Sequence, residues 1–150
     1  MYEVRSLIEG HAARLATELI PPQALAALED ELRAQKTEGE IDSKAISEAG
    51  QNVHRLVVNS CGNQILAQMI LSLQDHFTRF RKLSLQLPEK VLSSHREHLE
   101  IVAALKRGDG GLAEHLVHEH HRHAAQYLLE SLLRRSADAR GPRLTIAVGD

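Results

Sequence analysis

Three histidines lie on the apolar stripes of three different predicted helices, an arrangement that can build a buried binding site. They are His54, His98 and His120. His98 and His120 each lie eleven residues from Asp109, in the turn 106–111. If this turn folds two helices back antiparallel, equal counts place both imidazoles at one height, about 16 Å from the bend at 1.5 Å per residue.

Imidazole rings gathered in an apolar core need partners, because an unpaired buried polar group costs free energy. A metal ion would supply such a partner, since neutral imidazole is the commonest metal ligand and suits zinc, nickel, copper and iron. Three histidines and a water make a tetrahedral site with an open position. An anionic ligand would resolve the same cost. The pattern therefore predicts a sensor or a binding pocket.

The chain has ten histidines, and most need no function. Any one of the three, taken alone, is better explained as a core histidine hydrogen-bonded to a neighbour, and only the set of three favours a site. His95 precedes His98 by about one turn and could replace it or support it as an outer partner. The remaining histidines are expected at the surface or in structural roles: His11, His76, His115, His118, His121 and His123.

Helical periodicity in the apolar residues predicts the elements that position these side chains. Asp42 or Ser43 is a suitable N-cap, and Gly62 suits the left-handed conformation that ends many helices. Pro21 and Pro88 stop or interrupt the pattern. Six helices are expected, over residues 2–20, 43–60, 64–85, 88–106 and 111–135, and over a segment that begins at Pro22 and fades beyond Gln35.

Amphipathic helices joined by short turns predict an all-α fold, an antiparallel bundle with its ligand site between facing helices. Residues 1–135 form one helical domain in this interpretation, and 136–150, which lack periodicity, form a disordered tail. Aromatic residues make up only 3% of the 150 residues and tryptophan is absent, which fits a helical core better than a sheet.

Charge and cysteine content limit the class of protein. A net charge of −2 without a basic stripe argues against direct binding of nucleic acid. The single cysteine, Cys61, cannot form an internal disulfide, which fits a reducing compartment. Neither a membrane span nor a signal peptide is recognisable. These features predict a soluble, cytoplasmic domain.

Several short motifs occur in an order known from one family. The opening Tyr2–Glu9 is followed by His54 and the small-residue turn Ser60–Asn63, and then by Glu97-His98 and by His120, with Gly108-Asp109 in the turn between the last two histidines. No single motif is specific, but together they cover about residues 1–130. The chain thereby resembles the C-terminal effector-binding domain, called FCD, of FadR-type transcription regulators in the GntR family.

The resemblance implies a divalent metal, zinc or nickel, held by His54, His98 and His120. It also implies a small organic acid that binds beside the metal and alters DNA binding by an attached winged helix-turn-helix domain. In the family an aspartate four residues before the first histidine is a further ligand. This chain has Gly50 there. Losing the anionic ligand is expected to weaken cation binding and to leave three neutral imidazoles.

Two further residues are candidates for the effector site. Gln51 shares a helix face with His54 and could supply a carbonyl oxygen. Arg5, at the position of the family's first-helix arginine, could clamp an effector carboxylate through two hydrogen bonds. A surface salt bridge between Arg5 and Glu9, four residues later, explains the arginine equally well. The resemblance also implies a homodimer.

The family's DNA-binding module lies on the N-terminal side of this domain, and Met1 falls almost at the start of the sensor region. We therefore expect either a fragment of a longer regulator or a protein that has lost its DNA-binding domain. In both cases this chain alone is not expected to bind operator DNA.

Two other functions compete with a ligand-sensing domain. A zinc metalloenzyme would use three histidines to activate a water. However, the chain contains neither His-Glu-x-x-His nor Glu-x-x-His, the helical signatures of zinc proteases and di-iron bundles, so no enzymatic activity is expected. A metal-free helical dimerisation module, whose core histidines bind nothing, is the other alternative.

Overall fold

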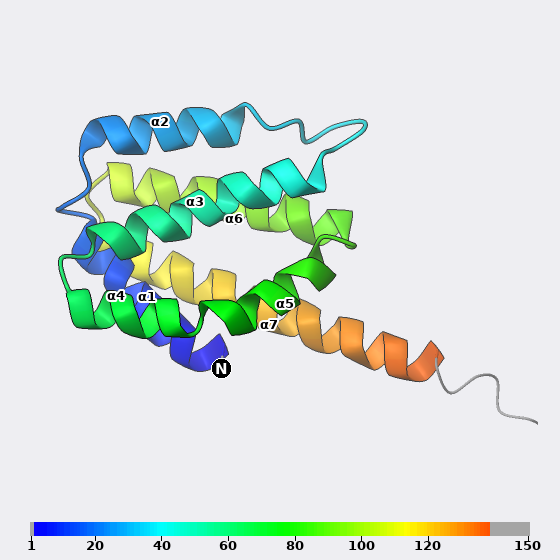
Figure 1. Ribbon diagram of the computed structural model, residues 1–150. Helices are drawn as coiled ribbons and strands as arrows, with labels where there is room; N and C mark the ends of the chain where they lie inside the picture. Colours follow the sequence, from blue (N-terminus) through cyan, green and yellow to red (C-terminus); the bar gives the residue numbers. More distant parts are fainter. Residues whose placement is uncertain (1, 139–150) are drawn as a thin grey trace, which may run out of the picture.

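The structure is a computed structural model that describes residues 2–138 of the chain (Figure 1). Seven helices joined by short connections occur among these residues. No strand occurs among these residues, which confirms the predicted all-α class. The helices are α1 (Tyr2–Ala16), α2 (Pro22–Arg33), α3 (Ser43–Ser60), α4 (Gln64–Ser72), α5 (Gln74–Ser84), α6 (Pro88–Lys106) and α7 (Gly110–Asp138).

Local chemistry sets several helix ends where the sequence predicts them. The Asp42 carboxylate caps α3 by accepting hydrogen bonds from the backbone N–H groups of Lys44 and Ala45, both at 3.0 Å. Gly62 takes a left-handed conformation, φ 69°, between α3 and α4. Pro22 lies in the first turn of α2, where its missing N–H costs nothing.

Three predicted boundaries differ from the structure. α1 ends at Ala16 rather than at residue 20, because Pro21 clashes with the preceding helical turn. The helix expected over 64–85 is divided at Leu73, whose N–H bonds the carbonyl of Ile70, three residues back, so that the regular pattern is interrupted. α7 extends to Asp138, beyond the expected end at 135, and the rest of the predicted tail, 139–150, lies outside the described residues.

Helix α6 occupies a central position in the bundle. It packs against α2, α3 and α7, while α1 packs mainly against α7 and α3 (Figure 1). The C-terminal part of α7 projects past the other helices. The apolar core joins these elements through fully buried aliphatic side chains: Ala12, Ala13, Ala16, Leu32, Ala49, Val53, Val57, Ile101, Val102, Leu105, Ala113 and Val117.

The turn between α6 and α7 sets the register on which the site depends. Gly108 is left-handed, φ 72°, and the Asp109 carboxylate accepts a hydrogen bond from the Leu112 N–H at 2.9 Å. The two helices fold back against each other from this turn. The centroids of the His98 and His120 rings lie 4.6 Å apart. The structure thus confirms that the two imidazoles lie at one height.

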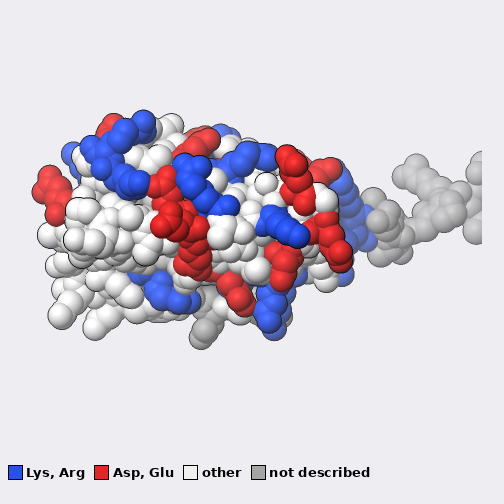
Figure 2. All heavy atoms as spheres, turned by 90° about the horizontal axis from the view of Figure 1, so that it is seen from above, with Lys and Arg blue, Asp and Glu red and all other residues white. Residues whose placement is uncertain are grey.

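Charged side chains are mixed on the face seen from the side of α2. Lysine and arginine alternate there with aspartate and glutamate, and no basic patch forms on this face (Figure 2). Within residues 2–138, no helix is both long enough and apolar enough to cross a membrane.

Candidate metal centre

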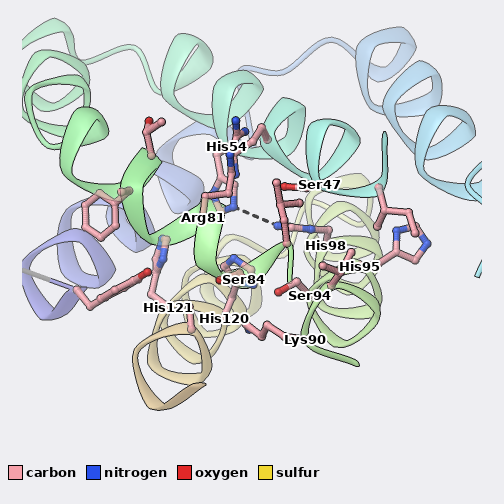
Figure 3. A pocket seen from close by; sticks show the side chains of 18 of the residues that line it. Ser47, His54, Arg81, Ser84, Lys90, Ser94, His95, His98, His120 and His121 are labelled. Atoms are coloured by element: carbon pink, nitrogen blue, oxygen red, sulfur yellow. Dashed lines mark hydrogen bonds between the residues drawn. The ribbon is translucent and has the colours of Figure 1, made fainter. Parts of the chain in front are cut away.

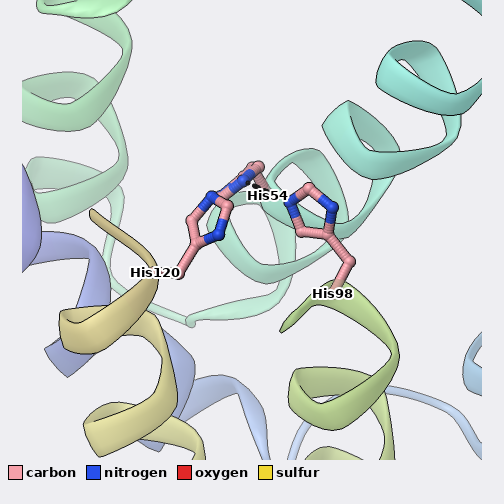
Figure 4. Close-up of side chains that lie close together, drawn as sticks. All are labelled: His54, His98 and His120. Carbon is pink, nitrogen blue, oxygen red and sulfur yellow. Dashed lines mark hydrogen bonds between the residues drawn. The ribbon is translucent and has the colours of Figure 1, made fainter. Parts of the chain in front are cut away.

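Three imidazole rings from three helices converge inside the bundle (Figure 4). His54 comes from α3, His98 from α6 and His120 from α7, and each is at most 7% exposed. One ring nitrogen of each lies within 4.8 Å of those of the other two. His54 Nε2 is 3.1 Å from His98 Nε2. The structure therefore brings together the three side chains that the sequence selects.

Two carboxylates, one buried and one half-buried, fix the orientation of two of these rings. Glu9 on α1 accepts a hydrogen bond from His54 Nδ1, and Glu97 on α6 accepts one from His120 Nδ1 at 2.7 Å. A carboxylate can only accept, so each Nδ1 carries the proton. In the neutral rings the opposite nitrogen, Nε2, then presents a lone pair. Carboxylates beyond the ligands orient metal-binding histidines in the same way.

The spacing of the nitrogens fits a shared cation. Ligand nitrogens about 2.0–2.1 Å from a zinc ion are separated by about 3.3 Å in tetrahedral geometry and by about 3.0 Å at a right angle. The 3.1 Å between His54 Nε2 and His98 Nε2 lies between these values. The same distance also allows one ring to donate a hydrogen bond to the other, so spacing alone is compatible with both arrangements.

Burial favours the neutral form of His98 and His120. It lowers the pKa of His98 well below the usual value, and the neighbouring rings of His120 and His54 lower it further. Burial lowers the pKa of His120 to about 3, although the hydrogen bond to Glu97 acts in the opposite direction. Neutral imidazole is the form that binds a metal.

A second cluster adjoins the first and centres on Glu9, which is completely buried. Its carboxylate contacts His54 Nδ1, Arg5 Nε at 2.7 Å and His121 Nε2 at 3.3 Å. Burial raises the Glu9 pKa, but the opposing effects of His54, His121 and Arg5 hold it well below the ordinary value. Glu9, His54 and His121 could also hold a metal by distance, but the Arg5 guanidinium already places a positive charge on this carboxylate. The cluster is better suited to orienting His54.

This cluster corrects two sequence-based predictions. His121 was expected at the surface, but it is 2% exposed, because α7 is covered on one side by α1 as well as by α6 on the other. The pair between Arg5 and Glu9 was considered as a surface salt bridge, but both side chains are largely buried, at 11% and 1% exposure. Arg5 also stacks on Phe77, 4.3 Å from the ring centroid.

The remaining histidines divide between surface and partial burial. His11, His76 and His115 are exposed, as predicted. His118 and His123 are half-buried instead. His123 Nδ1 lies 2.8 Å from Glu97, which therefore binds two imidazoles of α7.

Gly50 explains how the centre is assembled without an aspartate. A Cβ atom built on Gly50 would overlap the ring of His98. The ring thus fills the space beside α3 that a side chain at position 50 would need. With His98 in this position, the chain has no room for the aspartate that the resemblance places there.

A cavity of about 110 Å³ opens beside the three histidines (Figure 3). It exceeds by several times the roughly 10–15 Å³ that one water needs, so it can admit a small molecule. Both effector-site candidates from the sequence, Arg5 and Gln51, line it. So do polar side chains that the sequence analysis did not select: Ser84, Ser94, His95, Arg81 and Lys90.

Lys90 is the most unusual of these side chains, because its residue is only 3% exposed. Among the described residues, its ammonium has no hydrogen-bond partner and lies 4.8 Å from the centroid of the Tyr127 ring. Burial lowers the Lys90 pKa, while the carboxylate of Glu97 raises it. Arg81 Nε and His95 Nδ1 are likewise buried without a partner in the part of the chain described.

For some of the site residues that the sequence analysis did not select, the sequence contains a signal of their burial. Glu9 is a charged residue in register with Ala12, Ala13 and Ala16 on the buried stripe of α1, a pattern that marks a buried, paired carboxylate. Lys90 lies eight residues before His98, on the same face of α6. His121 had no such signal, because its burial depends on packing against α1.

Comparisons with known proteins agree with the geometry. The sequence profile described as FCD domain matches residues 1–123. A curated relative, the Nta operon transcriptional regulator of Aminobacter aminovorans, is 29% identical over 105 residues, which cover 70% of this chain. The chain spans about half of that relative's length, 49%. No solved structure matches the chain significantly.

Proposed function

Because the chain belongs to the FCD domain family, the C-terminal domains of GntR-type transcription regulators, we propose that it senses a small organic acid beside a divalent metal ion. His54, His98 and His120 would hold the ion, zinc or nickel. The observation that carries the proposal is the convergence of these three buried rings. The fixed Nδ1 protons of His54 and His120 support it, since they leave both Nε2 lone pairs for the metal.

A bound divalent ion would supply an electrophilic centre with a position open to an acid oxygen. The chain's own residues would do the rest of the recognition. Arg5 and Gln51 line the cavity and would contact the effector. Arg5 already uses its Nε for Glu9, so only its terminal nitrogens would be available to a carboxylate. Three neutral imidazoles leave the ion's positive charge uncompensated, which favours an anionic effector.

Transmission to DNA would follow from which helices the ion connects. The ligands come from α3, α6 and α7, and Glu9 joins α1 to the same centre through His54. Metal and effector would therefore tighten four helices at once. A winged helix-turn-helix domain attached before α1 would change its orientation with them. DNA binding in this proposal requires that attached domain and not this bundle.

Self-association is part of the proposal. Large apolar side chains on neighbouring helices α1 and α4 are about half exposed or more, and a homodimer interface would cover them: Val4, Leu7, Ile65 and Met69. A metal-free dimerisation module would share this surface, so the surface does not separate the two functions. The family match and the regulator-named relative support a regulatory domain rather than an enzyme.

Metal analysis of the purified protein tests the proposal. We expect about one zinc or nickel per chain, and a rise in melting temperature when zinc is added after chelation. His98→Ala should abolish both. His115→Ala, which changes an exposed histidine of α7, is the matched control and should retain both. Sub-stoichiometric metal in the wild type, or an unchanged metal content in His98→Ala, would favour the metal-free dimerisation module.

A further inference from the structure

Lys90 carries a positive charge into the bundle without a compensating hydrogen bond. The ammonium has three donors, and none of them has a partner within residues 2–138. The carboxylate of Glu97 raises the Lys90 pKa, but it is already engaged by His120 and His123 at 2.7 and 2.8 Å. A buried cation that lacks hydrogen bonds is unfavourable, because burial removes the water that would stabilise its charge. Such a group calls for an anionic partner.

The position of Lys90 shows where this partner would come from. Lys90, Ser94 and His98 follow each other at intervals of four residues, on one face of α6, and all three line the cavity beside the histidines. In the view of Figure 3, Lys90 lies on the side of the cavity opposite His54, with Ser84 and Ser94 between them. The cavity is thus lined by the three histidine rings and by an unpaired ammonium that lies about two turns before His98 on α6.

Two further groups make the cavity suited to an anion. Arg81 on α5 and His95 on α6 also line the cavity, and each has a buried ring or guanidinium nitrogen without a hydrogen-bond partner in the described chain. Among the described residues that line this cavity, none has a carboxylate side chain. The unpaired donors of the cavity therefore lack an anionic partner among these residues.

We propose that the effector is a small acid with two anionic groups, one at the three-histidine centre and the other bound by the Lys90 ammonium. This inference rests on the proposed function, because it assigns the first group to the metal. The second group can be a carboxylate or a phosphate, since both offer charged acceptor oxygens to an ammonium. Ser94, between Lys90 and His98, would hydrogen-bond the part of the ligand that joins the two acidic groups.

Calorimetric titration of the zinc-loaded protein with two ligand series tests this assignment. The diacids malonate, succinate and glutarate are compared with the monoacids of equal length, propionate, butyrate and pentanoate. In the wild type, the diacid of best length should bind at least about tenfold more tightly than its monoacid, because a hydrogen bond to a charged group contributes on that scale. Comparison of malonate with phosphonoacetate, which has the same number of backbone atoms, shows whether a carboxylate or a phosphorus oxyanion is preferred at the second position.

Lys90→Met keeps the length and packing of the side chain and removes its charge. We expect it to reduce the preference for the diacid to less than about threefold, while binding of the monoacid and the zinc content stay unchanged. Lys44→Met, at an exposed position of α3, is the control and should leave the preference intact. The wild-type comparison does not depend on whether the variant folds.

The outcomes separate this inference from the function on which it rests. Equal binding of diacids and monoacids by the wild type, or a preference that Lys90→Met leaves unchanged, would overturn the second anion site and leave the metal-bound acid intact. Failure of every acid to bind the zinc-loaded protein would overturn the proposed function, and the inference with it.

Discussion

The two halves of helix α6 have opposite chemistry. Its N-terminal half buries Lys90, His95 and His98, whereas its C-terminal half buries Ile101, Val102 and Leu105. All six of these residues are at most 5% exposed. The apolar half contributes to folding in the usual way, through burial of hydrocarbon at about 25 cal/mol per Å². The polar half opposes folding unless its groups find partners.

This difference assigns separate tasks to the two ends of the bundle. The apolar end, completed by residues such as Leu32 and Val57, holds the helices together. The polar end keeps neutral imidazoles and an unpaired ammonium beside a cavity, and a metal ion with an acidic ligand would compensate them. In the proposed function, the residues that stabilise the fold and those that would bind the ligand lie on successive turns of the same helix, so ligand binding would act on the bundle without forming part of its apolar core.

The largest effect is expected on the free energy of unfolding, from a mutation in the apolar half of α6. Ile101→Ala removes a fully buried side chain and should lower the free energy of unfolding by about 2–5 kcal/mol. Leu133→Ala, at a position 61% exposed on α7, should change it little. Urea unfolding of the metal-free protein measures both. Zinc affinity of folded Ile101→Ala should equal that of the wild type, and a parallel loss of affinity would show that the two halves are not separate.

Lowering the pH should reduce the stability of the metal-free protein through the buried histidines of the polar half. The folded-state pKa values of His98 and His120 are lowered, the latter to about 3, so the unfolded chain takes up protons first as pH falls below about 6.5. Stability of the metal-free protein should therefore drop between pH 7 and 5, by up to about 1.4 kcal/mol per pH unit for each of these histidines. The lowered pKa values of His95 and His121 act in the same direction.

Urea unfolding of the chelated protein at pH 7, 6 and 5 measures this effect. Bound zinc should raise stability at each pH without reducing this loss, because folded His98 and His120 are already unprotonated and the unfolded chain is the state that takes up protons. A stability that stays constant from pH 7 to 5 without metal would mean that these rings are not buried in neutral form.

The carboxylates behind the ligands should matter less than the ligands themselves. Glu97→Gln removes the charge that orients His120 and should weaken zinc affinity by about 10- to 100-fold. Glu100→Gln, at an exposed position of the same helix, is the control and should leave the affinity unchanged. Competition with a chromophoric chelator measures both affinities. Equal zinc affinity in the two variants would show that Glu97 does not orient His120 for zinc binding.

The smallest effect is expected at Gly50. In Gly50→Ala the added methyl group would displace the His98 ring, and zinc affinity should fall by about tenfold, on the scale of a disturbed ligand orientation. Gly111→Ala on α7, where the nearest non-adjacent atom is 3.7 Å from the new Cβ, provides the control. Both changes share the helix-propensity gain of about 1 kcal/mol. Unchanged affinity in Gly50→Ala would show that the ring has room to move.

Several helix ends, and the approach of His98 to His120, could be predicted from local sequence. Asp42, Gly62 and the prolines act within a few residues, and equal residue counts on either side of Asp109 fix the register of His98 and His120. The division at Leu73 could not be predicted, because no glycine or proline accompanies it. Burial of His121 could not be predicted either, since it depends on how α1 packs across α7.

Contacts between residues far apart in the chain could not be predicted from the sequence either. Glu9 and His54 are 45 residues apart, and no spacing rule connects α1 with α3. The steric role of Gly50 also needed coordinates, because a missing aspartate reads only as a lost ligand until the His98 ring is seen beside it.

Anomalous diffraction at the zinc edge, from crystals grown with zinc, tests the central claim most directly. We predict one peak per chain, bonded to the Nε2 atoms of His54 and His120 and to a ring nitrogen of His98. The claim would be contradicted by a zinc-soaked crystal that shows these three rings without a peak between them, or with the ion bound elsewhere on the chain.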